Sequence, residues 1–169
     1  MKAVGVILAI TIALALETTL ARYVVRGSTG VDLALVVVVY VALTSGPVTG
    51  LLAGTLAGLV QDALLSGVIG IGGLAKTIVG FLAGLIGTQF IVAASLPRFV
   101  VFFGATVLHA IVFMGLYVVL DLRHFGTPYA AVAGQAAGNA VVGVVAFQLA
   151  ELLPGAVGRR RMAKSRLRR

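Results

Sequence analysis

The sequence contains no cysteine and no tryptophan, and charged residues make up only 11% of its 169 positions. The absence of cysteine excludes disulfides, thiolate metal sites and a cysteine nucleophile. Common catalytic motifs are missing as well: there is no His-x-x-Glu-His zinc motif, no Gly-x-Ser-x-Gly elbow and no P-loop lysine motif. The sequence therefore predicts that the protein is not an enzyme and needs no cofactor or metal.

Hydrophobic residues dominate what is present. They make up 60% of the chain, and the mean hydropathy is +1.15, which is far too high for a water-soluble domain. A span needs roughly 20 residues to cross some 30 Å of hydrocarbon, so the length allows about five to seven spans. We expect an all-α fold: a polytopic membrane helix bundle with six transmembrane helices.

The expected spans follow from the breaks between apolar runs. Ser28 is a candidate N-cap for the second span, with Asp32 in its first turn, and Gly46-Pro47 ends that span. Leu96-Pro97-Arg98 reads as a loop, and Pro154-Gly155 is expected to stop the last span. The spans are then 3–23, 29–45, 47–65, 74–94, 99–120 and 127–151. Merging the short second span with its neighbour would leave five.

The net charge of +8 is concentrated at one end of the chain, which argues against a nucleic-acid-binding surface. Residues 1–158 form the expected transmembrane domain and residues 159–169 a basic tail. A polybasic segment directly after an apolar run is typical of a cytoplasmic end beside anionic lipid or partner proteins. Its basic residues are Arg159, Arg160, Arg161, Lys164, Arg166, Arg168 and Arg169.

Loop charges predict the orientation of the bundle. With six spans, nine Lys and Arg residues lie on the side of both termini, at Lys2, at Arg98 and in the tail, against three on the other side. The positive-inside rule then places both termini in the cytoplasm of a multi-pass protein in the plasma membrane, the inner membrane of a bacterium.

Glycine recurs at helical spacing in the segment 46–87. Gly50, Gly54 and Gly58 are four residues apart, and Gly80 and Gly84 repeat the pattern in the following run. Such spacing puts small residues on one helix face and lets another backbone approach closely in lipid. Two such helices joined by a short turn predict an antiparallel pair. The candidates for helix packing or partner contact are Gly50, Gly54, Gly58, Asp62, Gly67, Gly70, Lys76, Gly80 and Gly84.

Asp62 and Lys76 flank the turn between these two glycine-rich runs. One interpretation is that the two charges meet near the outer ends of the helices and either lock the pair or contact a partner, since ionisable groups inside a membrane are costly. The other is that each lies at an interface, where a lysine can snorkel to water.

Three further polar residues fall within apolar spans. His109 lies mid-span and is expected to be a packing residue that faces the bundle, the alternative being a proton relay or ligand. Gln135 and Asn139 are four residues apart, so they share a face. We expect them to form hydrogen bonds between helices; lining a polar pocket is the alternative. Glu17 and Glu151 lie near span ends and read as interfacial.

The segment 46–87 resembles the MreD family of bacterial rod shape-determining proteins. The likeness is carried by Gly46-Pro47, Gly50, Gly54, Gly58, Gln61-Asp62, Ser66-Gly67, Gly70, Leu74-Ala75-Lys76-Thr77, Gly80 and Gly84. Size and span number agree over nearly the whole chain. Gly73 stands where members of the family often have a bulkier or polar residue, which affects the geometry of that turn.

The resemblance implies an inner-membrane scaffold of the cell-wall elongation machinery. Its expected partner is an MreC-like protein with a single span, alongside MreB, RodA, a class B penicillin-binding transpeptidase and anionic lipids. Members of the family also resemble the substrate-binding subunits of energy-coupling-factor transporters, but a shared fold does not imply a bound vitamin.

Two hypotheses of function follow. In the first, a non-enzymatic scaffold offers its small-residue faces to the span of a partner. In the second, a transporter subunit binds a vitamin-like molecule in a pocket near Gln135, Asn139 and Asp62.

Overall fold

A computed structural model describes residues 3–23, 30–64, 68–90, 94–122, 126 and 129–166, with side chains described for 4–19 of the first segment and 129–152 of the last. Its helices are α1 (Ala3–Tyr23), α2 (Leu33–Ser45), α3 (Pro47–Leu64), α4 (Ile71–Gln89), α5 (Ser95–Val119) and α6 (Tyr129–Arg166). The all-α prediction is confirmed over this part of the chain, in which every regular element is a helix.

The short helix α2 lies at the centre of the bundle and contacts each of the other five helices. Seven of its thirteen residues are buried, all of them aliphatic. Leu35, Val36 and Val39 belong to a core shared with α4, α5 and α6, whereas Ala34 and Val38 belong to a second core shared with α1 and α3. A helix that is apolar on all sides is stable only where protein or lipid surrounds it, and here the protein does so.

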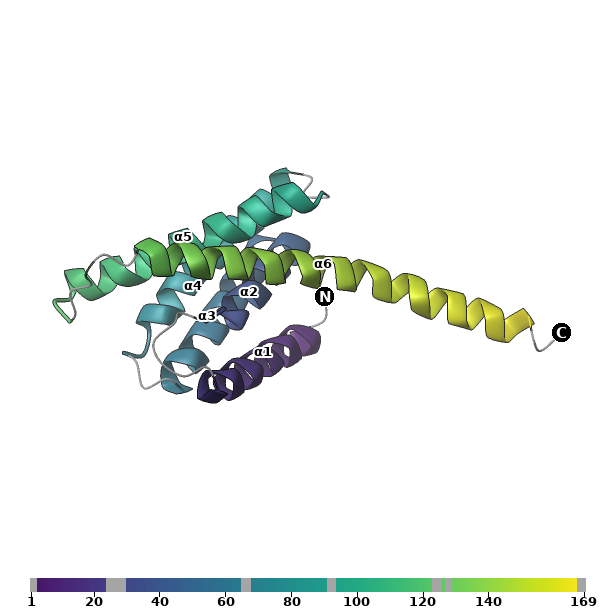
Figure 1. Ribbon diagram of the computed structural model, residues 1–169, viewed down its shortest axis with the longest axis horizontal. Coiled ribbons are helices and arrows are strands. Elements are labelled where there is room, and N and C mark those ends of the chain that lie inside the picture. Colours follow the sequence, from purple (N-terminus) through teal and green to yellow (C-terminus); the bar gives the residue numbers. More distant parts are fainter. Residues whose placement is uncertain are drawn as a thin grey trace.

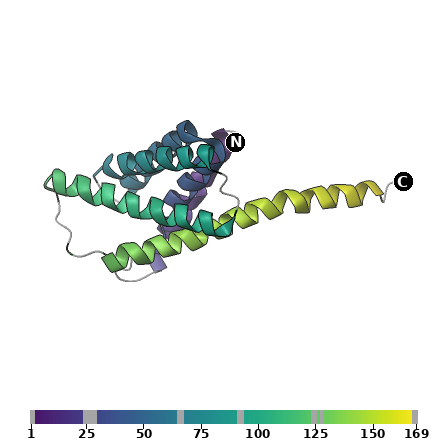
Figure 2. The same cartoon turned by 90° about the horizontal axis from the view of Figure 1, so that it is seen from above.

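The other helices are arranged around α2 in layers. Figure 1 shows α1 on one side of the bundle and α5 with α6 on the other, with α2, α3 and α4 between them. The helices α3 and α4 form a tight antiparallel hairpin, and α5 packs along α6. Both views place the first turn of α1 at the end of the bundle from which the C-terminal part of α6 projects (Figures 1 and 2).

Four helices, α3 to α6, are long and apolar enough to cross a membrane. Helix α2 is shorter, as is Val4–Thr19, the stretch of α1 whose side chains are described. Helix α2 would be about 20 Å long at 1.5 Å per residue. Six transmembrane helices therefore remain a prediction, whereas a helical membrane protein is what the composition and these four helices indicate.

Several predicted boundaries were wrong. Helix α2 begins at Leu33, and its N-cap is Asp32, whose side chain accepts a hydrogen bond from the Leu35 amide. The predicted cap Ser28 lies outside the described residues. The prediction overlooked that an aspartate is as good a cap as a serine. The end of α2 at Ser45, with Gly46 as C-cap and Pro47 starting α3, is as predicted.

Two other predicted boundaries, each placed at a proline, were wrong: the start of α5 and the end of α6. Helix α5 begins at Ser95, so Pro97 lies in its first turn, where a proline loses no intrahelical hydrogen bond. Helix α6 continues through Pro154 and Gly155 to Arg166 instead of stopping there. The residues that follow, chiefly Ala, Arg, Lys and Met, favour helix, which offsets the single backbone bond that a proline removes.

Helix α4 is displaced towards the N-terminus from the predicted 74–94, since it runs from Ile71 to Gln89. Its N-cap is Gly70, whose φ of +107° is a left-handed conformation that glycine adopts at little cost. Phe90 is extended and ends the helix. The predicted opening of α6 at 127–128 lies outside the described residues.

Candidate functional site: a buried polar network

The glycine faces of α3 and α4 pack against each other. A Cβ atom added at Gly54 would lie 2.6 Å from the carbonyl carbon of Lys76, and one added at Gly58 would lie 2.5 Å from the Cα of Gly73. Gly50 and Gly80 face each other in the same way, and Gly84 meets Pro47. The predicted antiparallel contact is therefore made within this chain. Because the faces cover each other, these glycines are not open to a partner helix in this conformation.

Asp62 holds the turn between the two helices. Its Oδ2 accepts hydrogen bonds from the backbone amides of Gly70, at 2.9 Å, and Gly73, at 3.2 Å. A carboxylate at the start of α4 satisfies amides that have no partner within the helix and interacts favourably with the helix dipole. Gly73 thus contributes its amide and leaves room for Gly58. Gly67 lies outside the described residues.

Lys76 forms an ion pair with Asp32 and not with Asp62. Its Nζ donates to Asp32 Oδ2 at 2.6 Å, and only 2% of the lysine is exposed. The expectation that Asp62 and Lys76 meet was wrong, and so was the alternative that Lys76 snorkels to an interface. The physical reason is direction: Asp62 points towards the amides of Gly70 and Gly73 that begin α4, whereas Lys76, three residues beyond Gly73, points into the bundle.

His109 completes a triad with this pair. Its Nε2 lies 3.3 Å from Lys76 Nζ. An ammonium group can only donate, so Nε2 is the unprotonated acceptor of the imidazole. The ring also stacks on Phe113, with 5.7 Å between centroids. His109 faces the bundle, as predicted, but it contacts a buried charge as well as apolar neighbours.

Asp32 is the hub of the network. Its Oδ1 caps α2 through the Leu35 amide at 2.7 Å, and its own backbone N–H donates to Asn139 Oδ1 at 2.9 Å. Asn139 is fully buried, and its Nδ2 donates to Thr106 Oγ1 at 3.0 Å. The α1–α2 connection, α5 and α6 are thereby held together by a single asparagine.

The polar pocket considered for Gln135, Asn139 and Asp62 is not formed by these residues. The oxygen and the nitrogen of the Asn139 side-chain amide both form hydrogen bonds within the protein. Gln135 Nε2 donates to the Gly30 carbonyl at 3.2 Å. Asp62 is occupied by backbone amides in another part of the bundle. The expected hydrogen bond between helices is confirmed for Asn139, which joins α6 to Thr106 of α5, whereas Gln135 bonds to Gly30 in the connection before α2.

Glu17 extends the network to α1 and α3. One carboxylate oxygen accepts from Gln61 Nε2 at 2.6 Å and the other from the Ala34 amide at 3.3 Å. The network connects all six helices. Glu17 joins α1 to α3 and to the start of α2, Lys76 joins α4 to Asp32 and to His109 of α5, and Asn139 joins α6 to Asp32 and to α5. Buried polar networks whose members are all bonded rigidify a fold and specify one arrangement. The sequence analysis missed Asp32 and Glu17 as members; their rarity, as two of five acidic residues, was the available signal.

A second ion pair joins α5 and α6 at the opposite end of the bundle. Arg98 donates to Glu151, and its guanidinium lies 4.5 Å from the ring centroid of Phe147. Arg98 is only 5% exposed, whereas the carboxylate of Glu151 is largely exposed. Neither residue was predicted as part of a site, and the interfacial position expected of Glu151 stays a prediction. Sequence reasoning placed Arg98 in a loop because of Pro97.

The arrangement of these groups fits a structural role. The charges of Asp32 and Lys76 neutralise each other, and both carboxylate oxygens of Asp32, Lys76 Nζ and His109 Nε2 have partners in the protein. Among the described residues, no three histidine or acidic side chains gather closely enough to hold a metal ion. The site holds helices together.

Removing the Asn139 side chain should test this role. Asn139→Ala would leave the buried Asp32 amide without a partner and remove the donor to Thr106 Oγ1, which would keep only its bond to the Phe102 carbonyl, at a cost of about 1–3 kcal/mol. We expect a lower unfolding temperature in detergent, measured by circular dichroism. Gln135→Ala, on the same face but only partly buried, is the matched control and should change stability by less than about 0.5 kcal/mol. Equal effects of the two substitutions would contradict the network.

Fold and site together define a helical membrane protein whose polar residues serve mainly to fix its helices. A family model described as rod shape-determining protein MreD matches residues 1–152. The chain belongs to the MreD family of rod shape-determining membrane proteins, and the resemblance noted in the sequence is confirmed. No curated protein and no solved structure is similar enough to the chain to count as a match. The likeness to energy-coupling-factor subunits thus stays a prediction.

Proposed function

We propose that this protein is a non-enzymatic scaffold of the cell-wall elongation complex in the bacterial inner membrane. It would bind an MreC-like single-span protein and so connect cell shape to peptidoglycan synthesis by RodA and a class B penicillin-binding transpeptidase, alongside MreB. The observation that carries the proposal is membership of a rod shape-determining family over residues 1–152. The internally bonded network supports it, because such a network suits a rigid platform better than a reacting site.

The surface for the partner span should lie on lipid-facing side chains. The glycine faces are covered by each other, whereas Leu52 of α3 and Ile111 of α5 are 56% and 63% exposed. In lipid, helices associate through van der Waals packing and not through a hydrophobic driving force. A partner span would therefore fit along the ridges of α3 or α5 without unfolding the hairpin.

Cysteine cross-linking can locate this partner, because the natural chain has no cysteine to interfere. We expect that Leu52→Cys or Ile111→Cys forms a disulfide in native membranes with a cysteine scanned along the single span of the MreC-like protein. The reactive positions should recur every three or four residues. Ala53→Cys, at a buried position, is the matched control and should not react. Absence of cross-links from every exposed position of α3 and α5 would contradict the proposed complex.

The basic tail is proposed to lie in the cytoplasm, with both termini on that side, and to bind anionic lipid or partner proteins. Each Lys or Arg near an anionic surface contributes about 1 kcal/mol. Replacing the seven basic residues of the tail by Gln should lower the yield of cross-linked partner and leave the unfolding temperature, measured by circular dichroism, unchanged. An unaltered yield of cross-linked partner would remove the tail from the proposal.

A further inference from the structure

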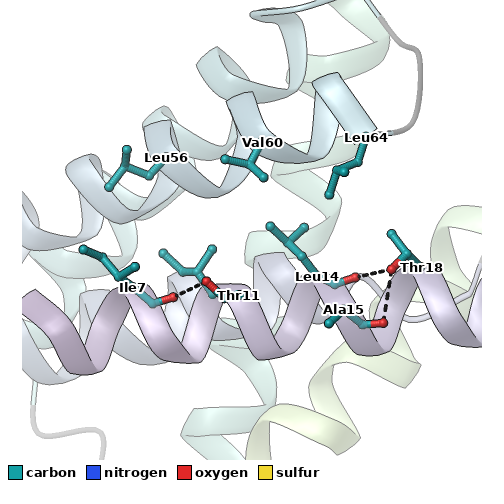
Figure 3. A pocket seen from close by; sticks show the side chains of 9 residues that line it. Ile7, Thr11, Leu14, Ala15, Thr18, Leu56, Val60 and Leu64 are labelled. Carbon is teal, nitrogen blue, oxygen red and sulfur yellow. Dashed lines mark hydrogen bonds between the residues drawn. The ribbon is translucent and has the colours of Figure 1, made fainter.

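Helix α1 is joined to the rest of the bundle by one polar side chain. An open groove with a volume of about 460 Å³ lies between α1 and α3, and the hydroxyls of Thr11 and Thr18 that line it donate to carbonyl groups of α1 itself (Figure 3). Among the side chains described for α1, only that of Glu17 forms hydrogen bonds with other helices, to Gln61 of α3 and to the Ala34 amide of α2. The protonation state of this carboxyl group therefore affects how α1 is held.

Two carboxyl groups meet at the first turn of α2. Glu17 accepts a hydrogen bond from the Ala34 amide at 3.3 Å, and Asp32 accepts one from the Leu35 amide at 2.7 Å. These amides belong to consecutive residues, so the two carboxyl groups lie close together. Two carboxylates that share a site repel each other, which favours the protonated form of one of them.

Lys76 of α4 compensates only one of these two negative charges. Its Nζ donates to Asp32 at 2.6 Å, and the two side chains are 2% and 7% exposed. His109 of α5 accepts from the same ammonium group through Nε2, so its ring is neutral. Helices α3 and α6 contribute uncharged side-chain amides to the network. With Glu17 ionised, the described groups of the network would carry one uncompensated negative charge, which is costly within a membrane.

The contact between Glu17 and Gln61 has the length of a hydrogen bond from a carboxylic acid. Glu17 Oε1 lies 2.6 Å from the side-chain amide of Gln61. Hydrogen bonds from N–H to oxygen are mostly about 2.7–3.2 Å long, whereas those from O–H to oxygen are about 2.5–3.0 Å long. A half-turn of the Gln61 amide exchanges its nitrogen and its oxygen with little change in shape. A protonated Glu17 would then donate to the Gln61 oxygen and still accept from the Ala34 amide.

We propose that Glu17 is a proton-binding site: in the folded bundle at neutral pH its carboxyl group is protonated and donates to the side-chain oxygen of Gln61. Loss of this proton would leave an unpaired charge where α1 meets α2 and α3, and would loosen α1. The proposal depends on the polar network and not on the scaffold function, so either can fail without the other.

Infrared spectroscopy of protein that contains isotope-labelled glutamate tests the site, because the chain has glutamate only at positions 17 and 151. We expect the labelled wild type to show the carbonyl band of a protonated carboxyl group at neutral pH, and Glu17→Gln to lack this band. Glu151→Gln is the matched control and should keep the band, since the carboxylate of Glu151 is largely exposed and pairs with Arg98.

Thermal unfolding as a function of pH gives a second readout. The folded wild type would hold one proton more than the unfolded chain, in which a glutamate ionises above about pH 4.3. Its stability relative to Glu17→Gln should therefore fall as the pH rises from about 5 to 7, by about ten-fold in the folding equilibrium constant per pH unit. Both proteins contain His109, so its own titration cancels in this difference.

Three outcomes would overturn the proposal: no band of a protonated glutamate in the wild type at neutral pH, the same band in Glu17→Gln, or a stability difference that does not change with pH. A band that appears only after Arg22→Gln or Arg26→Gln would also overturn it, because it would show that an arginine outside the described side chains pairs with an ionised Glu17. If Glu17→Gln does not fold, the labelled wild type and Glu151→Gln together still assign the band.

Discussion

Replacing Lys76 by Met is expected to destabilise the bundle by about 3–5 kcal/mol, because Asp32 would remain as a buried anion without its counter-charge. The two side chains are 2% and 7% exposed, and 2.6 Å separates Nζ from Oδ2. Methionine is close to lysine in shape, so packing around the aliphatic stem should change little. The loss of stability in Lys76→Met therefore reports mainly on the missing positive charge.

A double substitution separates charge from packing. Asp32→Asn combined with Lys76→Met removes both charges, and the asparagine can still cap α2 through the Leu35 amide. We expect the double variant to regain more than half of the stability lost by Lys76→Met, since replacing a whole buried pair is often close to neutral.

Reversible unfolding in mixed micelles, followed by circular dichroism, measures both variants. Leu74→Met is the matched control, because Leu74 lies two residues earlier in α4 and is 49% exposed. It should behave as the wild type. Wild-type stability of Lys76→Met would show that the ion pair does not hold the bundle together.

Gly54→Ala is expected to cost about 3 kcal/mol or more, although it adds only one methyl group. The new Cβ would overlap the backbone carbonyl of Lys76, and a backbone atom in a packed helix cannot move aside as a side chain can. The helices α3 and α4 would have to separate along their whole contact. Gly54→Leu should therefore prevent folding of the hairpin.

Gly115→Ala is the control for this substitution. A Cβ at Gly115 meets nothing within 4 Å, so alanine there should stabilise α5 by about 0.5–1 kcal/mol through its higher helix propensity. The unfolding temperature of each variant, measured in the same detergent, gives the comparison. Similar temperatures for Gly54→Ala and Gly115→Ala would mean that the two backbones are not in close contact.

Glycine substitutions in α3 are unsuitable for mapping the surface that binds a partner. If glycine substitutions in α3 unfold the hairpin, loss of a partner from such variants reports on the fold and not on a binding face. Substitutions on exposed positions such as Leu52 or Ile111 avoid this difficulty, because they leave the α3–α4 contact intact.

Composition and residue spacing were enough to predict the class of the protein and the elements of its hairpin. Apolar runs interrupted by Gly46-Pro47 fixed the end of α2 and the start of α3, because a proline suits a first turn and cannot continue a helix. The four-residue spacing of Gly50, Gly54 and Gly58 determined a face of close backbone contact, since residues at that spacing share one side of a helix.

Only the tertiary structure decided which partner each polar residue has. Lys76 lies 14 positions from Asp62 and 44 from Asp32, yet it pairs with Asp32, because the packing of α2 against α4 brings their atoms together. The glycine faces could equally have received another protein's helix; the α3–α4 hairpin covers them. Periodicity along one helix defines a face, but what lies against that face depends on how the helices pack, and this was not encoded in any local pattern.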